Sequence, residues 1–150
     1  MTDFSAIVFG KAQVGRSYRV RPAAYGVVLD ARGHVALVRD TPYLFLPGGG
    51  MDPGETPEEA LEREIWEECG CASRVGRPIG RAVQFHVTEG QAIELHANFF
   101  EATFTAAPER PGELELSWWN LADAVAEMRH ECQVWAAELL LRERRRSLGG

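Results

Sequence analysis

The strongest constraint on the fold is a glycine-rich stretch, Pro47–Gly50, followed after a short polar segment by a helical pattern rich in glutamate. Thr56 suits a helix N-cap, a proline follows at the first helical position, and Glu59 completes a capping box three residues after the cap. Gly70 is a suitable residue to end the helix. The sequence therefore predicts a turn at the glycines and a helix over residues 57–69.

Three carboxylates of this helix lie on one face. Glu64, Glu67 and Glu68 are three and four residues apart, which makes them surface neighbours, and Arg63 lies beside them. Carboxylates so close together repel one another at neutral pH unless a positive charge lies between them. Mg²⁺ or Mn²⁺, hard cations that prefer oxygen ligands, would resolve this repulsion. The alternative is an ordinary solvated face, which we favour for the other glutamates of the helix.

The spacing of these residues resembles the Nudix box, the signature of hydrolases that cleave a nucleoside diphosphate linked to another moiety. The charged and glycine positions of that pattern are Gly49, Glu55, Arg63, Glu64, Glu67, Glu68 and Gly70. All of them are filled at the fixed intervals of the motif, which makes the signal strong. The one departure is Cys71, where the family usually has a larger aliphatic residue, and a buried cysteine behaves as a small hydrophobe.

The resemblance implies metal-dependent hydrolysis of a phosphoanhydride bond. Glu64, Glu67 and Glu68 would be the metal ligands, and the backbone carbonyl of Gly49 would complete the coordination of Mg²⁺ or Mn²⁺. Arg63 would orient a carboxylate, for which Glu55 is the best candidate, through a charge-assisted bidentate bond.

The general base stays open among four carboxylates, because the family differs internally on which group deprotonates the water. These candidates are Glu55, Glu68, Glu113 and Glu115. His86 and His96 lie on adjacent predicted strands, where they would face one another, although a histidine on a strand is more often structural or exposed than bound to substrate.

The rest of a substrate needs an apolar or stacking surface and cations for distal phosphates. The aromatic candidates are Tyr25, Tyr43, Phe45, Phe85, Phe99 and Trp118. The cationic candidates are Arg16, Arg19, Arg21 and Arg39. A second arginine cluster lies near the C-terminus, and we expect it to be a solvated helix end that is favoured by the helix dipole. That cluster consists of Arg142, Arg144, Arg145 and Arg146.

Substrate class is the least determined property. Nucleoside triphosphates, including oxidised deoxynucleotides, are the default that the resemblance implies, with ADP-ribose-type sugar nucleotides and dinucleoside polyphosphates behind them. A sensor with the Nudix fold that holds a nucleotide without cleaving it is a rival, but such modules usually lose box carboxylates. The isoprenoid diphosphate isomerase branch is a second rival; it needs a catalytic cysteine outside the box, and Cys132 in a late helix is poorly placed for that role.

The remaining pattern predicts strands around one central helix, with helices at the C-terminal end. The predicted strands are 23–29, 34–38, 43–46, 83–87, 93–104 and 113–119, with a hairpin loop at 88–91. Asn120 is expected to cap a short helix that begins at Leu121, and a last helix is expected over 131–146. This order indicates an α+β fold or an α/β/α sandwich, and the resemblance implies the sandwich, with the box helix against a mixed sheet.

Length and composition indicate one Nudix domain over residues 1–150, with 1–20 as an N-terminal extension and 21–146 as the core. The net charge of −6 argues against a nucleic-acid polymer as partner, so a small nucleotide-like substrate is expected, for a monomer or a homodimer. No apolar run approaches the roughly 18 residues of a membrane span, and no signal peptide is recognisable. Three cysteines without a framework spacing predict free thiols in a reducing cytoplasm.

Overall fold

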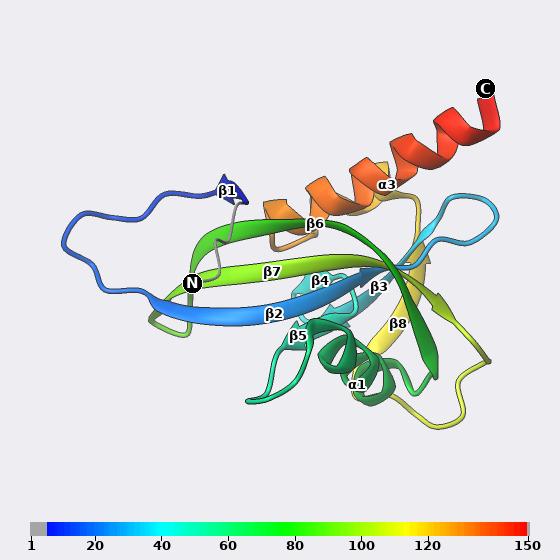
Figure 1. The fold of residues 1–150 in the computed structure, drawn as a ribbon, viewed down its shortest axis with the longest axis horizontal. Coiled ribbons are helices and arrows are strands. Elements are labelled where there is room, and N and C mark those ends of the chain that lie inside the picture. Colours follow the sequence, from blue (N-terminus) through cyan, green and yellow to red (C-terminus); the bar gives the residue numbers. More distant parts are fainter. Residues whose placement is uncertain (1–5, 150) are drawn as a thin grey trace.

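The structure is a computed structural model that describes residues 6–149. Its central layer is a mixed five-stranded sheet in the order β1-β6-β7-β2-β5, beside a three-stranded sheet in the order β4-β3-β8 (Figure 1). The strands are β1 (Ile7–Phe9), β2 (Arg19–Val27), β3 (Val35–Asp40), β4 (Tyr43–Phe45), β5 (Gly48–Gly50), β6 (Ser73–Thr88), β7 (Gln91–Phe104) and β8 (Glu115–Trp119). The helices are α1 (Pro57–Cys69), α2 (Leu121–Ala124) and α3 (Glu131–Gly149).

Two apolar clusters, one on each side of the main sheet, hold these elements together. On one side α3 packs through residues such as Leu140 against Phe99 of β7 and Leu37 of β3. On the other side α1 packs through Leu61 and Ile65, together with Phe100 and other residues of the sheet. Figure 1 shows α3 and α1 on opposite sides of the long strands. The mixed sheet between two helical layers confirms the predicted fold class.

Helix α1 has the bounds and the caps that the sequence predicts. Thr56 accepts a hydrogen bond from the backbone of Glu59 at 3.1 Å, and Glu59 accepts one from the backbone of Thr56 at 3.0 Å. Gly70 ends the helix in a left-handed conformation, with φ of 69°. A side chain there would meet the carbonyl oxygen of Arg110, so the glycine is needed both for its backbone angle and for close packing.

The glycines before the helix form a strand rather than the predicted turn. Gly48–Gly50 pairs antiparallel with Ala23, Ala24 and Tyr25 of β2. Gly48 has φ of 139°, and a Cβ there would lie 2.2 Å from the carbonyl oxygen of Ala24. The prediction was wrong because three glycines carry no side-chain pattern, so only their main-chain hydrogen bonds show that they form a strand.

Several other strands differ from prediction at their ends. β6 begins at Ser73 rather than at residue 83, with register shifts around Pro78 that conceal the alternation of a regular strand. β2 begins four residues earlier than predicted, and β1, which pairs parallel with β6, was not predicted at all. Both additions consist largely of exposed residues held by pairing partners far away in sequence. Residues 1–5 of the predicted N-terminal extension lie outside the described residues.

Residues 113 and 114 also leave their predicted strand. The backbone of Glu113 donates to the carbonyl of Glu67 at 2.9 Å, and that of Leu114 donates to the carbonyl of Glu68 at 3.1 Å. These two residues therefore cap the last turn of α1, and β8 begins only at Glu115. None of the helices within residues 6–149 is long and apolar enough to cross a membrane.

A candidate active site at the glutamate helix

Arg63 is bound on several sides at the start of the acidic face. Its Nε and Nη2 donate to the two carboxylate oxygens of Glu55 at 2.7 and 2.8 Å, and Nη2 also donates to the carbonyl of Gly50 at 3.0 Å. Its Nη1 donates to Glu64 at 3.0 Å and to Glu67 at 3.3 Å. The guanidinium lowers the pKa of Glu55 to about 2, chiefly through its hydrogen bonds, so Glu55 stays ionised.

Glu68 lies deeper than the other carboxylates, at the last turn of α1. It accepts a hydrogen bond from the backbone N–H of Gly48 at 2.8 Å. Burial raises its pKa to about 8, with further contributions from Glu64, Glu113 and Glu67, against the lowering effect of the Gly48 N–H. The pKa of Glu64 is raised by burial as well. Like charges therefore crowd this face without full compensation.

The glycine strand brings the backbone against this face. A Cβ at Gly49 would lie 2.9 Å from the carboxyl carbon of Glu64, so only glycine leaves room for that carboxylate. Glu68 reaches the neighbouring Gly48. Glu64 and Glu68, one helical turn apart, thus both abut the main chain of β5.

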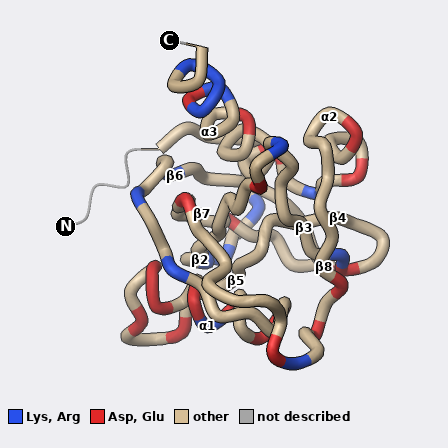
Figure 2. Tube along the Cα trace, turned by 90° about the vertical axis from the view of Figure 1, so that its right-hand side faces the viewer, with Lys and Arg blue, Asp and Glu red and all other residues tan. Residues whose placement is uncertain are grey.

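The donor set fits a hard divalent cation in its chemistry. It offers carboxylate oxygens that repel one another, one of them buried with a raised pKa, which is the environment that Mg²⁺ or Mn²⁺ relieves. The carboxylates are not gathered around one point, since no three His, Cys, Asp or Glu side chains within residues 6–149 are arranged as a metal centre. The reason is visible in the contacts: Arg63 draws Glu64 and Glu67 to itself, while Glu68 bonds to Gly48. Figure 2 shows acidic residues gathered along α1 and the loop before it.

A cleft of about 550 Å³ adjoins these residues. Gly48, Gly49 and Glu68 form one wall, and Arg21 extends from β2 so that a Cβ at Gly50 would lie 3.0 Å from its guanidinium. The remaining lining is mixed and includes charged, polar and aliphatic residues. Its aromatic and histidine members are Tyr25, Tyr43, Phe45, His86 and His130.

Only some of the residues predicted to contact the substrate line this cleft. Of the six aromatic candidates, Tyr25, Tyr43 and Phe45 line it. Phe99 instead lies in the core, Phe85 packs on Tyr18 and Trp118 packs on Phe104. Of the four arginines, Arg21 lines it. The others, Arg16, Arg19 and Arg39, do not.

The two predicted strand histidines do not face one another, so that prediction was wrong. His86 is paired in the sheet with Ile93, whereas His96 is paired with Val83 and bonds to Glu94 at 2.6 Å. The ring of His86 instead lies 4.5 Å, centroid to centroid, from that of His130.

Arg129 and His130 are cleft residues that the sequence analysis missed. Arg129 donates to the carbonyl of Val87 at 2.8 Å, and its guanidinium lies 5.0 Å from the centre of the Tyr43 ring. Burial lowers the pKa of His130 to about 3, helped by His86 and Arg129, so its ring is neutral. Both residues stand in an irregular segment between α2 and α3, where no periodicity marks them; an adjacent Arg-His pair before a helix was the only signal.

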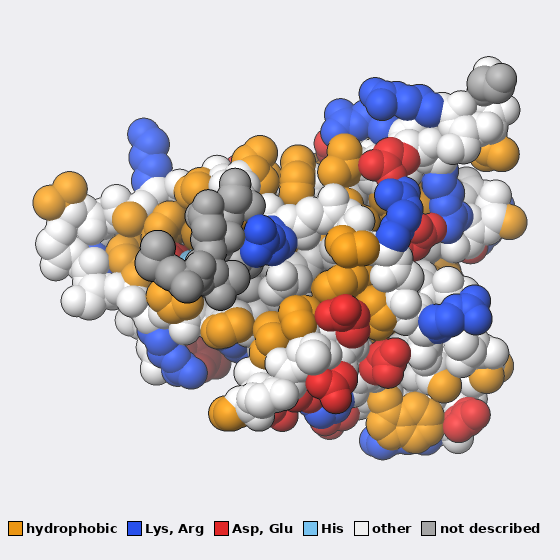
Figure 3. Space-filling model, viewed as in Figure 1, with side chains coloured by type: hydrophobic (Ala, Val, Ile, Leu, Met, Phe, Trp, Pro, Cys, Tyr) orange, Lys and Arg blue, Asp and Glu red, His pale blue; other side chains and the backbone are white. Residues whose placement is uncertain are grey.

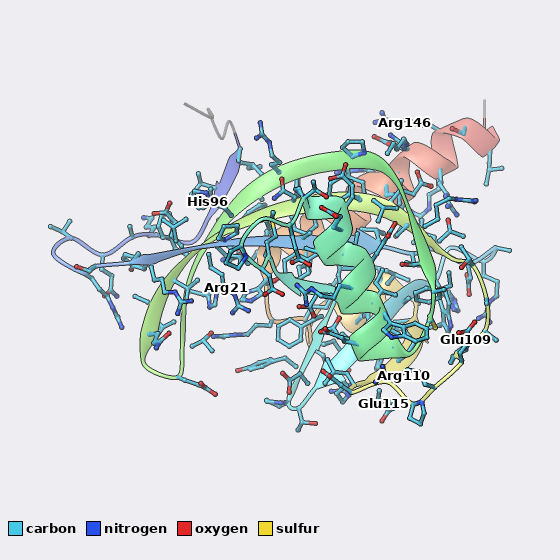
Figure 4. All side chains as sticks on the ribbon, turned by 60° about the horizontal axis from the view of Figure 1, so that its bottom comes forward. Arg21, His96, Glu109, Arg110, Glu115 and Arg146 are labelled. Carbon is cyan, nitrogen blue, oxygen red and sulfur yellow. The ribbon has the colours of Figure 1, made fainter. Side chains whose placement is uncertain are left out.

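The base candidates occupy different positions. Both oxygens of Glu55 are taken up by Arg63 and the backbone of Asp52. Glu113 is among the charges that raise the pKa of Glu68, whereas Glu115 is not. Figure 4 shows Glu115 beside Arg110 at the C-terminal end of α1, with Arg21 on the other side of the helix.

The family model of the NUDIX domain matches residues 19–142. A Bacillus subtilis (strain 168) protein named "Putative 8-oxo-dGTP diphosphatase" is 44% identical over 59 residues, which cover 38% of this chain and 40% of that protein. Diphosphoinositol polyphosphate phosphohydrolase 3-alpha of Mus musculus is 35% identical over 66 residues, covering 42% of this chain and 40% of that protein. The matches thus span less than half the length of these relatives.

Among solved structures, a NUDIX hydrolase from Nitrosomonas europaea superposes with a TM-score of 0.71. The superposition covers 81% of this chain and 88% of the other, at 19% sequence identity. At so low a sequence identity, this structural similarity shows a shared fold and nothing more.

Proposed function

The chain belongs to the NUDIX domain family, and on that premise we propose that it hydrolyses a phosphoanhydride bond in a nucleoside triphosphate, including oxidised deoxynucleotides. Water adds to phosphorus, one P–O bond of the anhydride breaks, and a nucleoside monophosphate and pyrophosphate leave. The observation that carries the proposal is the position of Glu64 and Glu68 against the glycine strand, at the edge of an aromatic-lined cleft.

Mg²⁺ or Mn²⁺ would be held by Glu64, Glu67 and Glu68 with the carbonyl of Gly49. Bound there, the cation would lower the pKa of water and neutralise charge on the phosphoryl oxygens. Arg63 holds the helix that carries these carboxylates against the preceding loop through its bonds to Glu55 and Gly50. The Arg21 guanidinium, on the cleft side, is placed to bind a non-bridging phosphate oxygen.

For the proton acceptor we favour Glu113 over the other candidates. Glu55 is committed to Arg63, and Glu68 is committed to Gly48 and to the proposed cation. Glu113 is held at the end of α1 by its backbone bond to Glu67, and its charge acts on Glu68. In this proposal the Glu113 carboxylate, which is close enough to Glu68 to raise its pKa, would take the proton without being a metal ligand.

The lining of the cleft favours a nucleotide over a substrate crowded with phosphates, such as the one in the name of the mouse relative. Only two arginines, Arg21 and Arg129, line it, and Asp40 and Glu89 lie on the same surface. The rings of Tyr43 and Phe45 instead offer aromatic surface on which a base can stack.

Two rival functions are disfavoured by particular residues. A nucleotide sensor would have no use for the complete set of box carboxylates. An isomerase would need an accessible thiol, but Cys132 is fully buried and its pKa is raised by burial to about 12. Cytoplasmic location stays a prediction that accords with three buried free thiols.

The test is a panel of nucleoside triphosphates, sugar nucleotides and dinucleoside polyphosphates, with specificity constants measured in Mg²⁺. We expect a triphosphate to rank first, with pyrophosphate as product. A sugar nucleotide or dinucleotide ahead of every triphosphate by tenfold, about 1.4 kcal/mol of transition-state preference, would contradict the substrate class and leave the chemistry intact.

A further inference from the structure

A second cavity, of about 350 Å³, lies on the α3 side of the sheet and shares no lining residue with the cleft. It is lined by the turn between β2 and β3, by the start of α2 and by the C-terminal half of α3. The lining residues that bear on its chemistry are Leu121, Glu138, Leu141, Arg142 and Arg145.

The walls of this cavity are fixed by hydrogen bonds. Asp30 accepts from the backbone N–H groups of Arg32 and His34, both at 2.9 Å, which holds the β2–β3 turn. Gly33 in that turn has φ of 81°, and a Cβ there would lie 3.6 Å from Leu141 of α3. Asn120 caps α2 by accepting from the backbone of Ala122 at 3.0 Å. The cavity is therefore part of the fold and not a gap between loose segments.

One face of α3 supplies an apolar floor and a cationic rim. Glu138, Leu141, Arg142 and Arg145 stand at i, i+3, i+4 and i+7, so they line one side of the helix. The floor is made by Leu141, 8% exposed, and Leu121, 7% exposed, where the main core reaches the surface.

The two rim arginines of α3 have no counter-ion. Arg144, on another face of the helix, bonds to Glu101 at 3.1 Å. Arg142 and Arg145 are exposed and make no hydrogen bond or ion pair within residues 6–149. Two like charges three residues apart repel each other, and an anion placed between them would relieve that repulsion. Figure 3 shows basic side chains gathered over the C-terminal part of α3.

We propose that this cavity is a second ligand site, which binds a small organic phosphate. The apolar or aromatic body of the ligand lies on Leu121 and Leu141, and its phosphate lies between Arg142 and Arg145. The volume is near the lower end of the range of ligand pockets, about 300–1,000 Å³, which suits a ligand no larger than a mononucleotide. The site is independent of the proposed hydrolysis.

The same observations disfavour a polymer. A nucleic acid needs an extended basic surface, but the neighbouring face of α3 carries Glu143, which pairs with Arg77, and Arg144, which pairs with Glu101. Glu138 also stands at the rim of the cavity. The basic surface of α3 is therefore short and interrupted by acidic side chains.

The experiment is a titration of the full chain with AMP in the presence of EDTA, in which binding is monitored through the amide chemical shifts. Without a divalent cation, the carboxylates of α1 repel phosphate, so the cleft does not compete. We expect shifts at Gly33, Ala122 and Val125. Arg145→Glu should weaken AMP binding at least tenfold, and Arg142→Gln, an independent variant, should weaken it as well. Arg146→Glu is the matched control, because it makes the same charge change one residue later, outside the cavity, and it should stay within twofold.

Four results would overturn the proposal. Equal weakening by Arg145→Glu and Arg146→Glu would indicate diffuse attraction to the helix end. Shifts centred on Gly48 and His86 would place AMP in the cleft. Inorganic phosphate that binds as tightly as AMP would mean that the apolar floor adds nothing to the affinity. A single-stranded RNA that binds more tightly than AMP at the same amides would mean that the small volume does not exclude a polymer.

Discussion

At the residue scale, Arg63 organises the candidate site. It bonds to both oxygens of Glu55, to the carbonyl of Gly50 and to Glu64 and Glu67. These bonds hold the helix and the loop before it in one geometry, and they leave Glu68 and Glu113 outside the network. A guanidinium in a planar fork can do this, whereas a lysine ammonium cannot match the bidentate contact.

The role proposed for Glu113 gives the first prediction. Glu113→Gln should lower kcat by about two orders of magnitude, the usual contribution of a general base. Glu115→Gln, two residues later and aligned with Arg39 in the three-stranded sheet, is the comparison variant and should retain the kcat of the wild type. If the two variants behave alike, Glu113 does not accept the proton.

His130 gives a prediction about stability and pH. Its pKa is lowered from 6.5 to about 3 in the folded protein, because it is buried beside His86 and Arg129. Between these values the unfolded chain takes up a proton that the folded chain does not, so the stabilisation is complete above pH 6.5 and is lost as the pH falls toward 3. Urea unfolding between pH 7 and 4 should therefore depend less steeply on pH in His130→Asn. Parallel curves for the two proteins would be evidence against a neutral, buried His130.

At the element scale, local signals predicted α1 and the cap of α2, whereas distant pairing partners decided the strands that the sequence did not reveal. The cap at Thr56 and the end at Gly70 depend only on residues close to them in sequence, so the predicted bounds of the helix were right. The glycine strand Gly48–Gly50 depends on pairing with β2, and the first half of β6 is interrupted by bulges around Pro78. Neither carries alternation, so neither can be recognised from its own residues.

The capping box provides the prediction for this scale. Thr56→Ala should lower the free energy of unfolding by about 1 kcal/mol, because the N–H of Glu59 loses its acceptor at the exposed helix start. Urea denaturation at neutral pH measures the change. Glu62→Gln, an exposed substitution in the middle of the same helix, should remain within about 0.5 kcal/mol of the wild type. A similar loss in both variants would show that the cap contributes nothing specific.

At the scale of the whole molecule, the acidic face depends on the local sequence, whereas the cleft depends on tertiary contacts. The spacing of Glu64, Glu67 and Glu68 is local to one helix, so it was readable from the sequence. The cleft joins β2, β4 and the segment before α3, through pairings such as the backbone of Leu44 with that of Glu127 at 3.0 Å. Arg129 and His130 enter it only through that tertiary arrangement, and hence the sequence did not point to them, whereas Arg21, Tyr43 and Phe45 were among its candidates.

The central claim is that this chain performs metal-dependent hydrolysis at the carboxylates of α1. The most direct measurement is pyrophosphate release from a nucleoside triphosphate by the purified protein in Mg²⁺, in EDTA, and with Glu67→Gln and Glu68→Gln variants whose fold is verified by circular dichroism. We expect no activity in EDTA, recovery when Mg²⁺ or Mn²⁺ is restored, and a loss of about two orders of magnitude or more in each variant. Full activity after chelation, or in the folded variants, would contradict it.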